Sequence, residues 1–192
     1  MKTQSENLSA QESLDIITGM IEQAKGSVQK NSFYFLLWGW VVVLANLAVF
    51  VLIRFTDYPN PFIVWSITIP AAIFSIIHGI RKDKQSRVST HLEKISAAIW
   101  IGFGITCFTF IIFGAKIGWQ INPVITIMCA TPTFVSGVII RFKPLMFGAI
   151  TLWVLGVASF VVGSSELQFL LSAIAITLGY LVPGYMLRSH EN

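Results

Sequence analysis

The chain has 192 residues, of which 55% are apolar and 11% are charged, with a formal net charge of +4 and a mean hydropathy of +0.74. A soluble domain carries about 25% charged residues, so this composition excludes a water-soluble globular domain and indicates a membrane protein. The lysines and arginines lie between long apolar runs, so the positive charge reflects membrane topology and does not predict nucleic-acid binding.

The first 32 residues are predicted to form a cytosolic segment that contains an amphipathic helix over about residues 9–30. They lack the apolar core of a cleavable signal peptide. Ser9 and Glu12 form a capping box at the start of this helix. The apolar stripe covers an arc of about 160°, and we interpret it as a possible partner-binding surface: Leu14, Ile17, Met20, Ile21, Ala24 and Val28.

The sequence alone does not decide which surface packs against this apolar stripe. The polar face of the helix begins with Glu12 and Asp15, whereas helices that bind lipid surfaces are usually basic there. A lipid surface is therefore less favoured as the occupant than the cytosolic face of the same chain, another protein or a second copy of the chain.

Six apolar runs follow the amphipathic helix. Each is close to the 20 or so residues needed to cross a bilayer as a helix, and the connections are short, so consecutive helices are expected to pack as antiparallel hairpins. The predicted fold is an all-α six-helix transmembrane bundle in three hairpins, over residues 33–187, with a cytosolic tail at 188–192. The predicted spans are 33–53, 62–80, 95–113, 121–140, 145–163 and 167–187.

The basic residues predict the orientation of these spans. Eleven of the thirteen lysines and arginines fall on the side of the two termini, and only Arg54 and Lys116 fall on the other side. Because short basic loops stay in the cytoplasm, we expect both termini to be cytoplasmic.

Catalytic, metal and cofactor sites are not predicted, and we expect a protein without enzyme activity. No span carries an acidic or basic residue at its centre, where such a group usually marks a transport or catalytic pathway. His78 is interpreted as a residue whose polar tip reaches the membrane interface, and Asn46 as a hydrogen-bond donor or acceptor to a neighbouring helix. Ser136 lacks a base in a later span, so it is not expected to act as a nucleophile.

Small and hydroxyl-bearing residues recur at helical spacing in three spans. Such stripes let helix backbones approach closely in lipid, although they are also compatible with a polar transport path. They comprise Ala98, Gly102 and Thr106; Thr126, Cys129, Thr133, Ser136 and Gly137; and Gly156, Ser159 and Gly163.

The basic residues of the cytosolic connections are a possible contact site for anionic lipids. Each is expected to contribute about 1 kcal/mol near an anionic surface, although the charges also suffice as topology signals. These residues are Arg81, Lys82, Lys84, Arg87, Arg141 and Lys143.

Four segments carry a resemblance to a known group of proteins: ESLDIITGMIEQAK (Glu12–Lys25), LLWGW (Leu36–Trp40), RFKP (Arg141–Pro144) and GYLVPGYMLR (Gly179–Arg188). In these the chain resembles uncharacterised small six-span inner-membrane proteins of Bacteroidota-type bacteria. The resemblance implies a six-helix membrane fold. Because members of that group are often encoded beside small winged-helix regulators, it also implies a signalling or stress setting.

Two functions are compatible with these features. The first is a non-enzymatic interaction or signalling-type membrane module that uses its N-terminal helix to engage a partner protein or a second copy. The second is a small carrier or channel for a neutral or apolar solute, suggested by the prolines in the even-numbered spans and by the hydroxyl stripe of the fourth.

Overall fold

The computed structural model describes residues 14, 18, 32–85, 91–118 and 120–191, which are largely helical and include no β-strand. Six helical stretches in this part of the chain are long and apolar enough to cross a membrane, which confirms a multi-pass membrane protein. They coincide within a few residues with the six predicted runs. The elements are α2 (Ser32–Phe55), η1 (Pro61–Ile67), α3 (Thr68–Gln85), α4 (His91–Ile112), η2 (Gly114–Ile117), α5 (Ile121–Ile140), α6 (Lys143–Val161), α7 (Ser165–Ile176), η3 (Thr177–Leu181) and α8 (Val182–Glu191).

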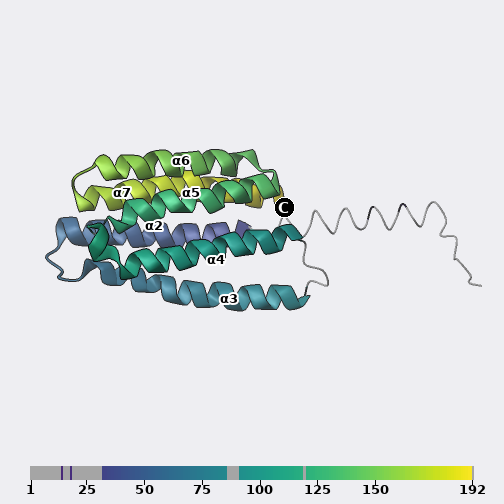
Figure 1. The fold of residues 1–192 in the computed structure, drawn as a ribbon, viewed down its shortest axis with the longest axis horizontal. Helices are drawn as coiled ribbons and strands as arrows, with labels where there is room; N and C mark the ends of the chain where they lie inside the picture. The colour runs from purple at the N-terminus through teal and green to yellow at the C-terminus, as the bar shows by residue number, and fades with distance from the viewer. Residues whose placement is uncertain (1–13, 15–17, 19–31, 86–90, 119, 192) are drawn as a thin grey trace, which may run out of the picture.

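The six spans lie side by side along the long axis of the molecule (Figure 1). The connections α2–α3, α4–α5 and α6–α7 lie at one end of the bundle, whereas the α5–α6 turn, the end of α3 and the C-terminus lie at the other. The end with the C-terminus therefore carries Arg81, near the end of α3, and Arg141, which follows α5.

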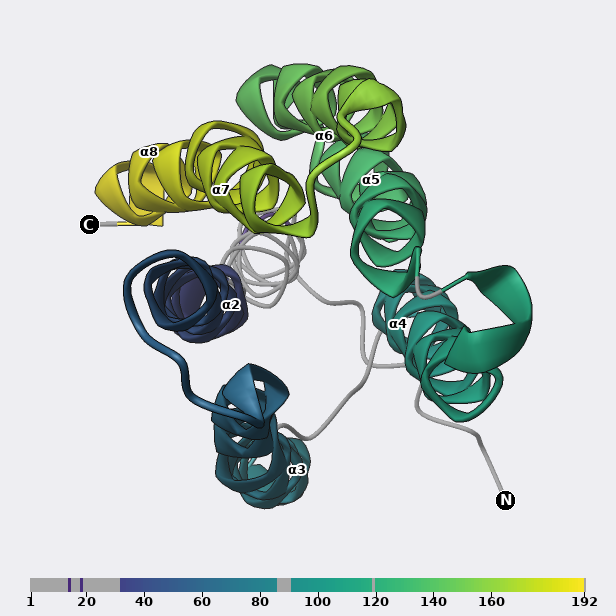
Figure 2. The ribbon, with the colours of Figure 1, turned by 90° about the vertical axis from the view of Figure 1, so that its left-hand side faces the viewer.

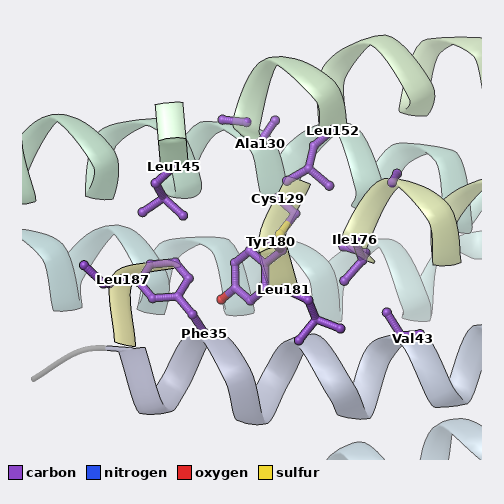
Figure 3. Close-up of a cluster of buried hydrophobic side chains, with 12 residues drawn as sticks. Phe35, Val43, Cys129, Ala130, Leu145, Leu152, Ile176, Tyr180, Leu181 and Leu187 are labelled. Carbon is purple, nitrogen blue, oxygen red and sulfur yellow. The ribbon is translucent and has the colours of Figure 1, made fainter. Parts of the chain in front are cut away.

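The core lies between α2, α5, α6 and the last span. The most extensive helix contact joins α5 to α6, and the next joins α2 to α7. Figure 3 shows side chains from all of these helices converging on Tyr180. The buried cluster comprises Phe35, Val43, Cys129, Ala130, Leu145, Ala149, Leu152, Ala175, Ile176, Tyr180, Leu181 and Leu187.

Helices α3 and α4 are peripheral to this core. Within the most apolar part of each span, 6% of the residues in the span made of η1 and α3 and none of those in the α4 span are buried inside the protein, against 33–56% for the other spans. Helix α3 packs on α2 and η1, while α4 packs mainly on α5 (Figure 2). Much of their apolar surface is therefore left for lipid or for another protein.

The sixth span is not a continuous α-helix, contrary to the simple helical run expected from its sequence. Helix α7 passes into a π-helical turn, in which the Val182 N–H bonds to the Thr177 carbonyl, before α8 begins. Pro183 explains the change, because proline lacks an N–H and its ring clashes with the carbonyl four residues earlier, at Gly179.

Glycines bring the last span and α6 into backbone contact. A side chain at Gly148 would collide with the Gly179 carbonyl oxygen, and one at Gly179 would collide with the Gly148 carbonyl. The predicted small-residue packing also holds at Gly137, which faces Met146, and at Gly156, which faces Ile127.

The same prediction fails for the stripe on α4. Gly102 has no described heavy atom within 4 Å of the position that a Cβ would occupy, and Gly163 has none either. Helix α4 is peripheral and packs mainly on α5, and Gly102 does not lie against that neighbour.

Candidate functional site

The predicted partner-binding stripe falls almost entirely outside the described residues. Leu14 is helical and 58% exposed. The other members of the stripe lie outside the described part of the chain: Ile17, Met20, Ile21, Ala24 and Val28.

The predicted lipid-contacting residues occupy two places at one end of the bundle. Arg81 is exposed near the end of α3. Arg141 and Lys143 are exposed in the tight α5–α6 turn, where Arg141 ends α5 in the left-handed conformation with φ 57°. Lys82 and Lys84 belong to α3 without described side chains, and Arg87 lies outside the described residues. The structure therefore presents three of the six cations at surface positions.

Two side-chain hydrogen bonds connect α3 to α2. The Tyr34 hydroxyl lies 3.0 Å from His78 Nδ1, and the Trp38 indole N–H donates to Ser75 Oγ over 3.1 Å. Because Tyr34 and Trp38 are one turn apart on α2, and Ser75 and His78 are one turn apart on α3, these bonds form two successive rungs between the helices. We refer to these four residues as the α2–α3 latch.

Aromatic rings surround the histidine of this latch. The Phe33 ring stacks on His78 at a centroid distance of 4.6 Å, and the Phe74 ring lies 6.3 Å away. His78 is half-buried, so the structure supplies it with a specific partner, Tyr34, that the sequence did not indicate. The signal available in the sequence was only that both residues lie near the same predicted membrane surface.

Trp100 connects α4 to the core. Its indole N–H donates to Ser136 Oγ of α5 over 3.1 Å, and its ring makes edge contacts with Phe35 and Tyr180 at centroid distances of 6.3 and 6.1 Å. Ser136 is therefore paired with an indole N–H, which cannot act as a base, so this pair does not have the chemistry of an activated nucleophile.

Asn46 does not form the predicted bond to a neighbouring helix. Its Nδ2 donates to the Val42 carbonyl of its own helix over 2.9 Å, and its Oδ1 is buried without a described partner. The Asn46 amide bonds within its own helix because the carbonyl one turn earlier is within reach, whereas α2 faces mostly apolar side chains here.

Two shallow apolar grooves open between helices. One of about 200 Å³ lies between α2 and the last span and includes Val43 and Ala173. The other, of about 240 Å³, lies between α4 and α5 and includes Phe103, Thr131 and Pro132. Both are suited to acyl chains or apolar side chains rather than to a polar substrate.

No family model, curated protein or solved structure matches the chain. Two helices are held to a close-packed core at few positions, and most of their apolar surface is uncovered.

Proposed function

We propose that the protein is a non-enzymatic interaction module of the bacterial inner membrane. In this proposal a rigid core formed by α2, α5, α6 and the last span anchors the chain. The cytosolic N-terminal helix then engages a protein partner or a second copy through the stripe that contains Ile17 and Ile21.

The observation that carries the proposal is the contrast between this core and the two peripheral spans. The core closes through backbone contacts at Gly148 and Gly179, whereas α3 and α4 leave most of their apolar residues uncovered. An element attached by a few contacts can respond to a binding partner at small energetic cost, because little packing has to be broken.

The proposal includes the orientation predicted from the basic residues. We infer that both termini are cytoplasmic and that the six spans descend as three antiparallel hairpins. Reporter fusions test this: a reporter at either terminus should be active only in the cytoplasm, and one inserted in the 56–60 connection only outside it. A periplasmic terminus would contradict the orientation and with it the cytosolic role of the helix.

A carrier for a neutral or apolar solute is the alternative. The α5 stripe speaks against a polar path, because Thr126 and Thr133 bond to carbonyls of their own helix. Reconstituted protein should therefore produce no flux of small neutral solutes above that of empty liposomes. Saturable uptake of any such solute would favour the alternative.

Site-specific photocrosslinking tests the partner directly. A crosslinking residue at Ile17 or Ile21, on the apolar stripe, should yield a defined product in intact cells. The matched control places the same group at Thr18 or Gln23, on the opposite face, and should yield little. Identical products from both faces, or no defined product from either Ile17 or Ile21, would refute the proposal.

A second copy and a different partner give different crosslinked masses. Co-expression of two differently tagged copies distinguishes them, since only self-association places both tags in one product.

A further inference from the structure

A cluster of buried amides and hydroxyls lies where α5 begins, α6 ends and α7 begins, far from the latch and the basic turn (Figure 1). Two direct hydrogen bonds link α5 to α7 within it. Thr126 Oγ1 lies 3.0 Å from Ser172 Oγ, and Gln168 Nε2 donates to Gln120 Oε1 over 2.9 Å. Gln168 Nε2 also lies 3.3 Å from the Val162 carbonyl at the end of α6.

The cluster also contains polar atoms without a described partner. Among the described residues, four buried side-chain polar atoms lack a hydrogen bond, and three of these belong to this region: Asn122 Nδ2, Ser159 Oγ and Ser164 Oγ. Leaving such an atom unpaired in a buried site costs about 1–3 kcal/mol, so three of them in one place require a common explanation.

Ser159 differs from several threonines of the spans. Thr106, Thr126 and Thr133 each donate to the carbonyl four residues earlier in their own helix. Ser159 is 0% exposed, yet its hydroxyl makes no such bond to Leu155. Its oxygen is therefore buried without a described hydrogen-bond partner, even within its own helix.

The helix geometry places these groups at similar heights. Gly156 of α6 lies against Ile127 of the antiparallel α5. With a rise of 1.5 Å per residue, Ser159 is about 4.5 Å and Asn122 about 7.5 Å beyond this contact, toward the α6–α7 connection. The same arithmetic puts Thr126 about 1.5 Å beyond the contact. Ser159 thus lies between the Thr126–Ser172 bond and the level of Asn122.

We propose that this cluster is a hydration site, in which at least one ordered water molecule joins Asn122 Nδ2 of α5 to Ser159 Oγ of α6. A water in this position accepts a hydrogen bond from the amide and donates to or accepts from the hydroxyl. Buried water requires two to four polar partners, and the cluster offers three unpaired atoms. Its members are amides and hydroxyls, so the site is suited to an uncharged ligand rather than to an ion.

Radiolytic hydroxyl labelling of the protein in lipid nanodiscs tests the site, because bound water labels adjacent side chains that bulk solvent does not reach. Pro123, which is fully buried beside Asn122 in the sequence, should be labelled several-fold more than the equally buried Leu152. Ser159→Ala should lower that labelling several-fold. The matched control is Thr151→Ala, which removes a hydroxyl bonded to its own helix on α6 and should leave the labelling unchanged.

Equal labelling of Pro123 and Leu152, or unchanged labelling in Ser159→Ala, would overturn the proposal. A structure of the unaltered protein at a resolution that shows water provides a test without substitutions. Density bridging Asn122 and Ser159 supports the site, whereas a Ser159 hydroxyl bonded to the Leu155 carbonyl with no water nearby refutes it. Both measurements are independent of whether the N-terminal helix binds a partner.

Discussion

Replacing Gly148 by alanine adds a methyl group where α6 and the π-helical turn meet backbone to backbone. The new Cβ would collide with the Gly179 carbonyl oxygen and lie 2.9 Å from its carbon and 3.1 Å from Pro183 Cγ. A carbonyl and a proline ring cannot rotate away as a flexible side chain can. The two helices must therefore separate, which weakens the core contact between α6 and the last span.

The expected cost follows from two terms. Overpacking of a close contact costs about 1–3 kcal/mol, and the upper end applies here because the new methyl group meets backbone atoms. Alanine recovers about 1 kcal/mol through its higher helix propensity. We expect Gly148→Ala to lower the free energy of unfolding by about 2 kcal/mol, which is more than a tenfold change in the equilibrium constant.

Gly102→Ala is the matched control, since Gly102 lies inside helix α4 with no described atom within 4 Å of the new methyl group. Only the propensity term remains there, so this variant should be more stable than the unaltered protein by up to about 1 kcal/mol. The two identical chemical changes should therefore act in opposite directions.

The free energy of unfolding of both variants can be measured on purified protein. Steric trapping measures it in bicelles, and tryptophan fluorescence measures it during a titration with denaturing detergent. Gly179→Ala should resemble Gly148→Ala, and the double variant should cost less than the two single costs added together, because both methyl groups disrupt one contact. If Gly148→Ala were as stable as Gly102→Ala, the backbone contact between α6 and the last span would not be a determinant of stability.

Three further substitutions follow from individual contacts. Trp100→Phe should cost about 1 kcal/mol of unfolding free energy and increase hydrogen exchange in α4, because it removes the bond to Ser136; unchanged exchange would contradict this. Asn46→Leu should stabilise the protein by about 1 kcal/mol in the same unfolding assay, since it removes a buried oxygen that has no described partner, and a loss of stability would indicate an undetected partner. Arg141→Gly should raise the unfolding free energy by about 1 kcal/mol, because glycine adopts the left-handed conformation at φ 57° without strain; destabilisation would show that the arginine side chain stabilises the turn.

Sequence reasoning predicted the feature that depends on composition alone. Long apolar stretches separated by charged connections must become helices in a bilayer, because lipid offers no hydrogen bonds to an open backbone. The six spans follow directly from this constraint. Gly156 was also recognised as a packing position, since small residues at helical spacing commonly mark helix contacts in lipid.

Which stripe packs against which helix depended on the tertiary structure. The stripe at Gly102 looks the same in sequence as the one at Gly156, yet only Gly156 lies against a neighbouring helix. Similarly, the Tyr34–His78 and Trp100–Ser136 bonds join residues 44 and 36 positions apart. Such pairs arise from the relative placement of helices, which apolar composition does not encode because lipid and protein interiors are equally apolar.

The sequence by itself therefore determined how many times this chain can cross a membrane and, through its basic residues, predicted which way it faces. The tertiary structure alone decided that α3 and α4 are peripheral, that Pro183 follows a π-helical turn and that Gly148 meets Gly179. The physical reason is that insertion depends on the transfer of each segment from water to lipid. Helix association depends instead on close fit and a few hydrogen bonds between segments that are already in the membrane.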